Sequence, residues 1–384
     1  MKVSSLFRSQ QTPTRRNKII AIVAVIAIAI AGYAIVVTRA SGFFASVSPA
    51  NATLSGNAKF VTESDGTQVL QFTAPVVTPP PTTPPISGWP SASTVGLKVA
   101  TTRTLDGAAI DDAAWFKENG FPGSGTQSDP WVVDRILFKD VVNMGRNKGA
   151  GLEGKWVKFT NCRFYGNPGN PTPSGSSALT ASFYAPFFII EDSTIGPNLP
   201  LLSTGGTSAG TNFGTMSWVP FQMRRTNVFG ANILVGFETE RSDTTGVLVE
   251  DNYLHDIFSA GGDHTDIING NGHASHVVIR HNYLDGIRSG NSYVANGIGI
   301  YNDNINVCDK CATIENWTVE KNYFDRANRM ILAPDSTSLF LNPFIIRDNT
   351  FTNRYSTAEG GIYAGRTPSL QSGNVDASGK ALQL

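Results

Sequence analysis

The residues best suited to chemistry gather in one polar passage near the middle of the chain. Its densest part is Asp263-His264-Thr265-Asp266, and four of the five histidines lie between residues 264 and 281. Carboxylate oxygens are the ligands that Ca²⁺ prefers, and an imidazole is the side chain most often used as a general acid or base. The passage therefore indicates either a reactive site or a turn rich in solvated polar groups, and both interpretations stay open.

Elimination from a uronate is the reaction that these groups fit best. Asp263 and Asp266 would hold Ca²⁺ against the sugar carboxylate, and His264 or Arg280 would take the neighbouring proton. Hydrolysis of a glycosidic bond would instead need two carboxyl groups flanking that bond. We therefore expect a polysaccharide lyase ahead of a glycoside hydrolase if the protein is an enzyme, and the sequence leaves open whether it is one.

A strand that starts near His264 would place this site on a surface. Side chains alternate along a strand, so His264 and Asp266 would share one face while Thr265 and Ile267 share the other. Ile267 is typical of a core position, which predicts that His264 and Asp266 face outward together. Further residues predicted to bind substrate on this surface are Glu238, His273, Tyr301 and Asp303.

A recurring eight-residue phrase supplies the elements that must position these groups. Its pattern is apolar, any, apolar, polar, polar, small polar, any, apolar, which is typical of a short strand followed by a bend. Copies recur at a spacing of roughly 30 residues, the signature of a solenoid or an array. They begin at Val157, Phe188, Phe221, Val247, Val277, Trp317 and Phe344.

The repeat predicts an all-β fold, a right-handed parallel β-helix of seven or more coils. Helical repeats would need amphipathic helices, and a propeller blade needs about four strands in roughly 40 residues. The sixth position holds Asn in the later copies, and Asn tolerates the left-handed conformation and bonds backbone at turns. Stacked coils would align these residues in a ladder: Asn252, Asn282, Asn322 and Asn349.

This pattern resembles the right-handed β-helix, pectate-lyase-like superfamily over about residues 88–370. The resemblance is carried by the segment Gly88-Trp89-Pro90-Ser91-Ala92-Ser93-Thr94-Val95-Gly96, by the Asn-Tyr-Leu/Phe coils and by Gly262-Asp263-His264. It implies an extracellular protein that meets polysaccharide. The reaction does not follow from it, because β-helices host lyases, hydrolases, esterases, epimerases and adhesins.

The N-terminal part predicts a tethered domain. Residues 1–18 form a basic cytoplasmic tail, and residues 19–37 are an apolar run long enough to span a bilayer as a signal anchor. A cleaved signal peptide is the alternative. A hairpin-like stalk follows at residues 38–74, and a Pro-rich extended linker at residues 75–92. The β-helix domain then occupies residues 93–384, with a cap that includes a short helix near Asp111 to Asn119.

Charge and cysteine content narrow the remaining classes of function. The formal net charge is zero and no basic block lies beyond the N-terminus, which argues against nucleic-acid binding. Cys308 and Cys311 are expected to form a disulfide that closes an insertion, with a redox pair or a zinc site as alternatives. We expect a monomeric, membrane-anchored, extracytoplasmic protein that acts on or binds polysaccharide. The alternative is a non-catalytic carbohydrate-binding or adhesion protein.

Overall fold

The computed structural model describes residues 58–62, 68–72, 87–166, 177–197, 211–238, 246–257, 265–271, 274–288, 292–293, 295–301, 316–333, 343–352, 354, 361–365 and 367–384. The chain divides into two compact units, Met1–Pro80 and Pro81–Leu384. In the first, β1 (Ala58–Thr62) and β2 (Gln68–Phe72) form an antiparallel pair. Residues 19–37 lie outside the described part, within which no helix is long and apolar enough to cross a membrane.

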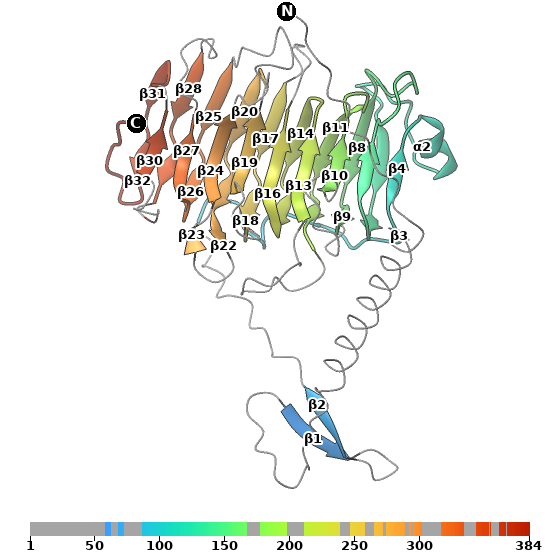
Figure 1. Cartoon of the computed structure of the whole chain (residues 1–384). Coiled ribbons are helices and arrows are strands. Elements are labelled where there is room, and N and C mark those ends of the chain that lie inside the picture. Colours follow the sequence, from blue (N-terminus) through green and yellow to red (C-terminus); the bar gives the residue numbers. More distant parts are fainter. Residues whose placement is uncertain are drawn as a thin grey trace, which may run out of the picture. The chain divides into compact units, whose positions relative to one another are not determined.

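The second unit is built from three parallel sheets that run side by side along one axis (Figure 1). Sheet 1 contains β4 (Ala108–Ile110), β7 (Val142–Met144), β10 (Ser177–Ala181), β13 (Thr211–Ser217), β16 (Ala231–Phe237), β19 (Thr265–Asn271), β24 (Ala295–Tyr301), β27 (Arg329–Leu332) and β30 (Gly361–Ala364). Sheet 2 contains β5 (Trp131–Asp134), β8 (Trp156–Thr160), β11 (Phe187–Glu191), β14 (Phe221–Arg224), β17 (Val247–Glu250), β20 (Val277–Arg280), β25 (Trp317–Glu320), β28 (Phe344–Arg347) and β31 (Leu370–Ser372). Sheet 3 contains β3 (Arg103–Leu105), β6 (Ile136–Phe138), β9 (Arg163–Phe164), β12 (Thr194–Ile195), β15 (Asn227–Phe229), β18 (Tyr253–His255), β21 (Tyr283–Asp285), β26 (Tyr323–Asp325), β29 (Thr350–Phe351) and β32 (Val375–Asp376). A small antiparallel pair, β22 (Ile287–Arg288) and β23 (Ser292–Tyr293), projects from one coil.

Each coil gives one strand to each sheet, so the fold is all-β and a parallel β-helix. Every phrase predicted from the sequence supplies a sheet 2 strand, the bend and then a sheet 3 strand. The coils extend further in both directions than the phrases predict. Trp131 begins an earlier coil that the pattern misses because Ile136 takes the polar sixth position. Leu370 begins a later coil within the tail.

The bend between sheets 2 and 3 is held by the predicted ladder. The Asn252 side chain accepts the backbone N–H of Thr226 at 2.8 Å, and Asn374 adds one further rung after Asn349. The left-handed residue is the one before each rung, such as Asp251, His281 and Lys321, with φ between 52° and 58°. The expectation that the Asn itself adopts this conformation is therefore wrong. The Asn amide instead binds backbone and side chains of neighbouring coils.

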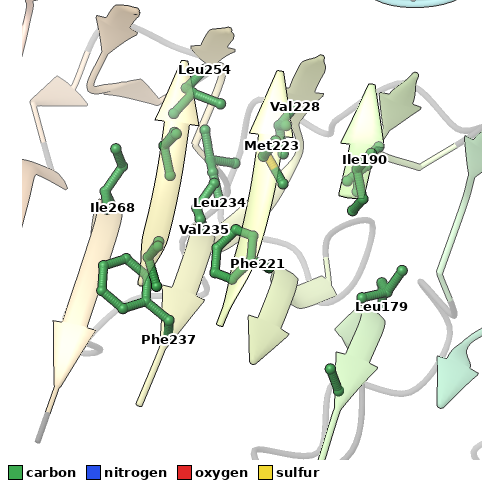
Figure 2. Packing of buried hydrophobic residues seen from close by; sticks show 14 of the residues in the cluster. Leu179, Ile190, Phe221, Met223, Val228, Leu234, Val235, Phe237, Leu254 and Ile268 are labelled. Atoms are coloured by element: carbon green, nitrogen blue, oxygen red, sulfur yellow. The ribbon is translucent and has the colours of Figure 1, made fainter. Parts of the chain in front are cut away.

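The inside of the solenoid is one continuous apolar cluster. Most strands place alternate residues inward, as Val247 and Val249 do in β17. Figure 2 shows part of this cluster, with Ile190 and Phe221 from sheet 2 and Phe237 from sheet 1. At one end, the helix α2 (Ala114–Glu118) buries Phe116 completely.

A segment that precedes β3 runs along the outside of the coils. We call residues 88–102 the strap. Its contacts move from late coils to early ones as the chain proceeds, from Gly88 beside His281 to Gly96 beside Arg225 and Thr102 beside Arg135. The strap thus links much of the solenoid before the first coil begins.

Candidate functional site

Asp266 lies in β19 at the centre of a polar cluster on sheet 1. Its carboxylate accepts hydrogen bonds from Asn269 Nδ2 at 2.7 Å, from Asn296 Nδ2 at 2.9 Å and from the Tyr301 hydroxyl at 3.1 Å. Asn296 also donates to the Tyr301 oxygen at 3.2 Å. The Asp266 side chain is fully buried. Such a carboxylate is better placed to orient its neighbours than to touch a sugar.

The strand does not alternate as the sequence predicts. Ile267 and Ile268 are both fully buried members of the apolar cluster, whereas strict alternation would place them on opposite faces. Asp266 also contacts Asn269, three residues later, which alternation would likewise place on the other face. The strand is therefore bent between Asp266 and Asn269, and both polar side chains lie on one side of the sheet.

A row of half-buried side chains crosses sheet 1 at the C-terminal ends of four successive strands. The members of this outer row are Trp218, Glu238, Asn271 and Tyr301. The residues just before them, Ser217, Phe237, Gly270 and Ile300, pair in register. Phe237 and Ile300 are buried in the core, so the outer row points away from it. Phe183, which is 40% exposed, extends the row, because its ring centroid lies 5.7 Å from that of Trp218.

Of the predicted site residues that the structure describes, only some lie close together. Asp266 and Tyr301 are in contact, and Glu238 lies two coils from Tyr301 in the outer row. Arg280 lies on sheet 2, where its Nε binds Glu250 at 2.5 Å. A different arginine, Arg329, lies closer to Asp266 in the sheet. The pairing of Ile298 with Ile331 places Arg329 opposite Asn296, on the coil after it.

The other predicted site residues lie outside the described part of the chain. They are Asp263, His264, His273, Asp303, Cys308 and Cys311. Within the described ranges, no group of three or more His, Cys, Asp or Glu side chains could hold a metal ion. The predicted Ca²⁺ ligand pair of Asp263 and Asp266 thus stays a prediction.

A second polar network, on sheet 3, was not predicted. Asp285 and Asp325 are adjacent in register and almost fully buried. Arg326 binds the Asp285 carboxylate through Nε at 2.9 Å and through its terminal nitrogen, and Arg354 binds Asp325. The Tyr283 hydroxyl donates to Asp325 at 2.9 Å.

Burial controls the electrostatics of this network. It raises the pKa of the Asp285 carboxyl against the lowering effect of the Arg326 guanidinium. It also raises the pKa of Tyr283, to which the negative charge of Asp325 adds. One sequence signal could have revealed the pair, because each Asp directly follows its phrase, in Asn-Tyr-Leu-Asp and Asn-Tyr-Phe-Asp.

Comparisons with protein-family models, curated proteins and solved structures found no match for this chain.

Proposed function

We propose that this protein binds an extended polysaccharide along the outer face of sheet 1. The observation that carries the proposal is the outer row, in which Trp218, Glu238, Asn271 and Tyr301 stand on four successive coils. Neighbouring strands lie about 4.8 Å apart, a step comparable to one sugar unit of an extended chain. A glycan parallel to the solenoid axis would therefore meet one side chain of the row at each step.

The chemistry of the row suits a sugar. Aromatic rings such as Trp218 offer a flat apolar surface with a polar edge, which can stack on the C–H face of a pyranose. Glu238 and Asn271 offer oxygen and nitrogen atoms to the sugar hydroxyls. Asp266 positions the end of the row, because it receives the Tyr301 hydroxyl and so restricts that ring.

In this proposal the right-handed β-helix domain is held outside the cell by the apolar segment 19–37 and acts as a monomer. The segment has the length of a bilayer-spanning helix, and the preceding basic residues favour a cytoplasmic N-terminus. A Pro-rich linker at residues 75–92 would hold the domain away from the membrane.

Uronate elimination is the second candidate, and the position of Arg329 favours it. This cation stands opposite Asn296, which contacts Asp266. A guanidinium there could bind the carboxylate of an acidic sugar, and the pair Asp263 and Asp266 would hold Ca²⁺. In the purely binding alternative, the same surface holds the glycan without changing it.

Binding of the full-length protein to a panel of neutral and acidic polysaccharides tests the proposal. We expect Trp218→Ala to weaken binding by at least about tenfold, equivalent to about 1.4 kcal/mol. Trp115→Ala, at a half-buried tryptophan of the cap, should bind as the wild type does. If the folded wild type binds no glycan of the panel, the proposal is wrong. Ultraviolet absorbance from unsaturated uronates, formed only with Ca²⁺, would identify the lyase, and binding without product would identify the non-catalytic protein.

A further inference from the structure

The strap is fastened to the late coils by one histidine. His281 Nδ1 lies 2.5 Å from Asp251 Oδ1, and His281 Nε2 lies 3.0 Å from the carbonyl oxygen of Gly88. The imidazole also stacks on the ring of Trp89, with centroids 5.2 Å apart. Trp89 in turn contacts Tyr323 at 5.5 Å. Gly88 and Trp89 are thus both held by His281, and Tyr323 is a further contact of Trp89.

Both ring nitrogens of His281 face atoms that accept hydrogen bonds. A neutral imidazole carries a single N–H, whereas the imidazolium carries two. An ionised carboxylate and a backbone carbonyl have no proton to offer. The two contacts can therefore be hydrogen bonds at the same time only when His281 is protonated. The stacked Trp89 ring favours the same form, because an indole face attracts a cation.

The charged groups around His281 have opposing effects on its protonated form. The left-handed bend residues of neighbouring coils follow one another as Asp251, His281 and Lys321. Asp251 favours the imidazolium and Lys321, which is exposed, opposes it. The nearby Arg280 and Glu250 are paired with each other, and Glu320 is paired with Arg347. On the strap side, Gly88 and Trp89 bring no charge.

The remaining anchors of the strap do not depend on a proton in the neutral range. The backbone N–H of Gly96 donates to the Arg225 carbonyl at 2.9 Å, and that of Thr102 to the Arg135 carbonyl at 2.8 Å. The Lys98 N–H donates to the Asn161 side chain at 3.3 Å. Pro90 is buried as well, so loss of the histidine contacts would free Gly88 and loosen Trp89 and leave the rest of the strap attached.

We propose that His281, Asp251, Gly88 and Trp89 form a proton-operated clasp. With His281 protonated the clasp is closed, and the chain leaves the solenoid at Trp89. Deprotonation removes one hydrogen bond and the cation over the indole ring, so the clasp opens. The Gly88 contact is then lost and the Trp89 ring is loosened, while Pro90 stays buried and Gly96 stays bound to Arg225. Histidine changes charge between about pH 5 and 8 in proteins, so the clasp is closed at the acidic end of this range and open at the alkaline end.

Fluorine NMR of the full-length protein labelled with fluorotryptophan tests the clasp. Trp89→Phe identifies the Trp89 signal, and the fully buried Trp317 is the internal reference. We expect the Trp89 signal to shift between about pH 5 and 8 while the Trp317 signal stays constant. His281→Gln should abolish the Trp89 transition, because glutamine still offers a donor but does not titrate. Asp251→Asn should move the Trp89 signal toward that of the open form, because the charged acceptor that faces His281 Nδ1 is removed.

The matched control is His276→Gln. His276 also has a left-handed backbone, with φ of 58° against 53° for His281, but it lies before β20, away from the strap, and its ring faces Asn316. This variant should keep the Trp89 transition. A Trp89 signal that does not respond to pH in the wild type overturns the proposal. So does a transition that survives in His281→Gln or is lost in His276→Gln, in variants whose Trp317 signal shows an intact fold.

Discussion

The Asn282 and Asn322 side chains bind each other across two successive coils. Asn322 Oδ1 accepts both the Nδ2 and the backbone N–H of Asn282, each at 3.0 Å. Asn282 Nδ2 also donates to the Val249 carbonyl at 2.9 Å, on the coil before. One fully buried side chain thus joins three coils, and its loss would leave buried backbone groups without partners.

We expect Asn282→Ala to lower the free energy of unfolding by at least about 2 kcal/mol, because unsatisfied buried groups cost about 1–3 kcal/mol each. The measurement is urea unfolding followed by circular dichroism. Asn282→Ser should lose less, since Ser193 occupies this position in an early coil and its hydroxyl accepts the Cys162 N–H at 3.0 Å. Equal losses in the two variants would contradict the assigned role of the side-chain acceptor.

Sequence was sufficient for the ladder because its four predicted rungs repeat Asn at one position of the phrase. It was insufficient for the bend conformation. The left-handed residues include Asp251, His281 and Lys321, which share no side-chain chemistry. The same conformation occurs at Arg135 and Asn161, which precede Ile136 and Cys162, so it belongs to the turn between the two strands and does not require one residue type.

Gly270 makes room for Trp317 inside the solenoid. A Cβ at Gly270 would lie 2.4 Å from Cη2 of the Trp317 ring. The indole Nε1 donates to the Ala274 carbonyl at 2.5 Å, which limits how far the ring can move. We expect Gly270→Ala to destabilise the fold by about 1–3 kcal/mol through overpacking, measured by thermal unfolding.

Trp317→Phe in the Gly270→Ala background separates this clash from other effects of the substitution. The smaller ring vacates the space that the new methyl group needs, so the double variant should lose less stability than the sum of the two single losses. Strict additivity would show that the methyl group and the indole do not compete for space.

The candidate site was less predictable than the fold, and Asp266 shows why. Alternation predicted an outward Asp266 from an inward Ile267, but a bend places Ile267 and Ile268 both in the core. Two hydrogen-bond partners of Asp266, Asn296 and Tyr301, also lie on the next coil. Register between coils depends on loop lengths, so a pattern along one strand cannot reveal these contacts.

Asp256 should steepen the loss of stability in acid. Burial is the largest effect and raises the pKa of its carboxyl, but the hydrogen bond from His255 at 2.8 Å and the charges of His255 and Arg326 together lower it more, so the net shift is downward. A depressed folded-state pKa gives stability that is present above the unfolded value of about 3.9. That stability is lost as the pH falls through the folded pKa.

Asp256→Asn should therefore show a smaller difference in unfolding free energy between neutral and acidic pH than the wild type shows. The check is a series of urea unfolding curves from neutral pH to below the unfolded carboxyl pKa. Asp106→Asn, at an exposed position, is the control and should keep the steep acid dependence. An unchanged acid dependence in Asp256→Asn would rule out this role.

Removal of Arg326 should produce a loss of stability that depends on pH. Its guanidinium is bidentate on Asp285, whose side chain is 2% exposed. Arg326→Gln leaves a buried carboxylate without this cation, and the expected loss is about 3–5 kcal/mol at neutral pH. The pKa of Asp285, already raised by burial, should rise further because the group that lowers it is gone. Protonation then relieves the buried charge, so the deficit relative to the wild type should shrink as the pH falls.

Arg326→Gln with Asp285→Asn should recover part of the loss at neutral pH and remove the pH dependence of the deficit. A deficit that stays constant with pH in the single variant would show that Arg326 acts through packing and not through its charge.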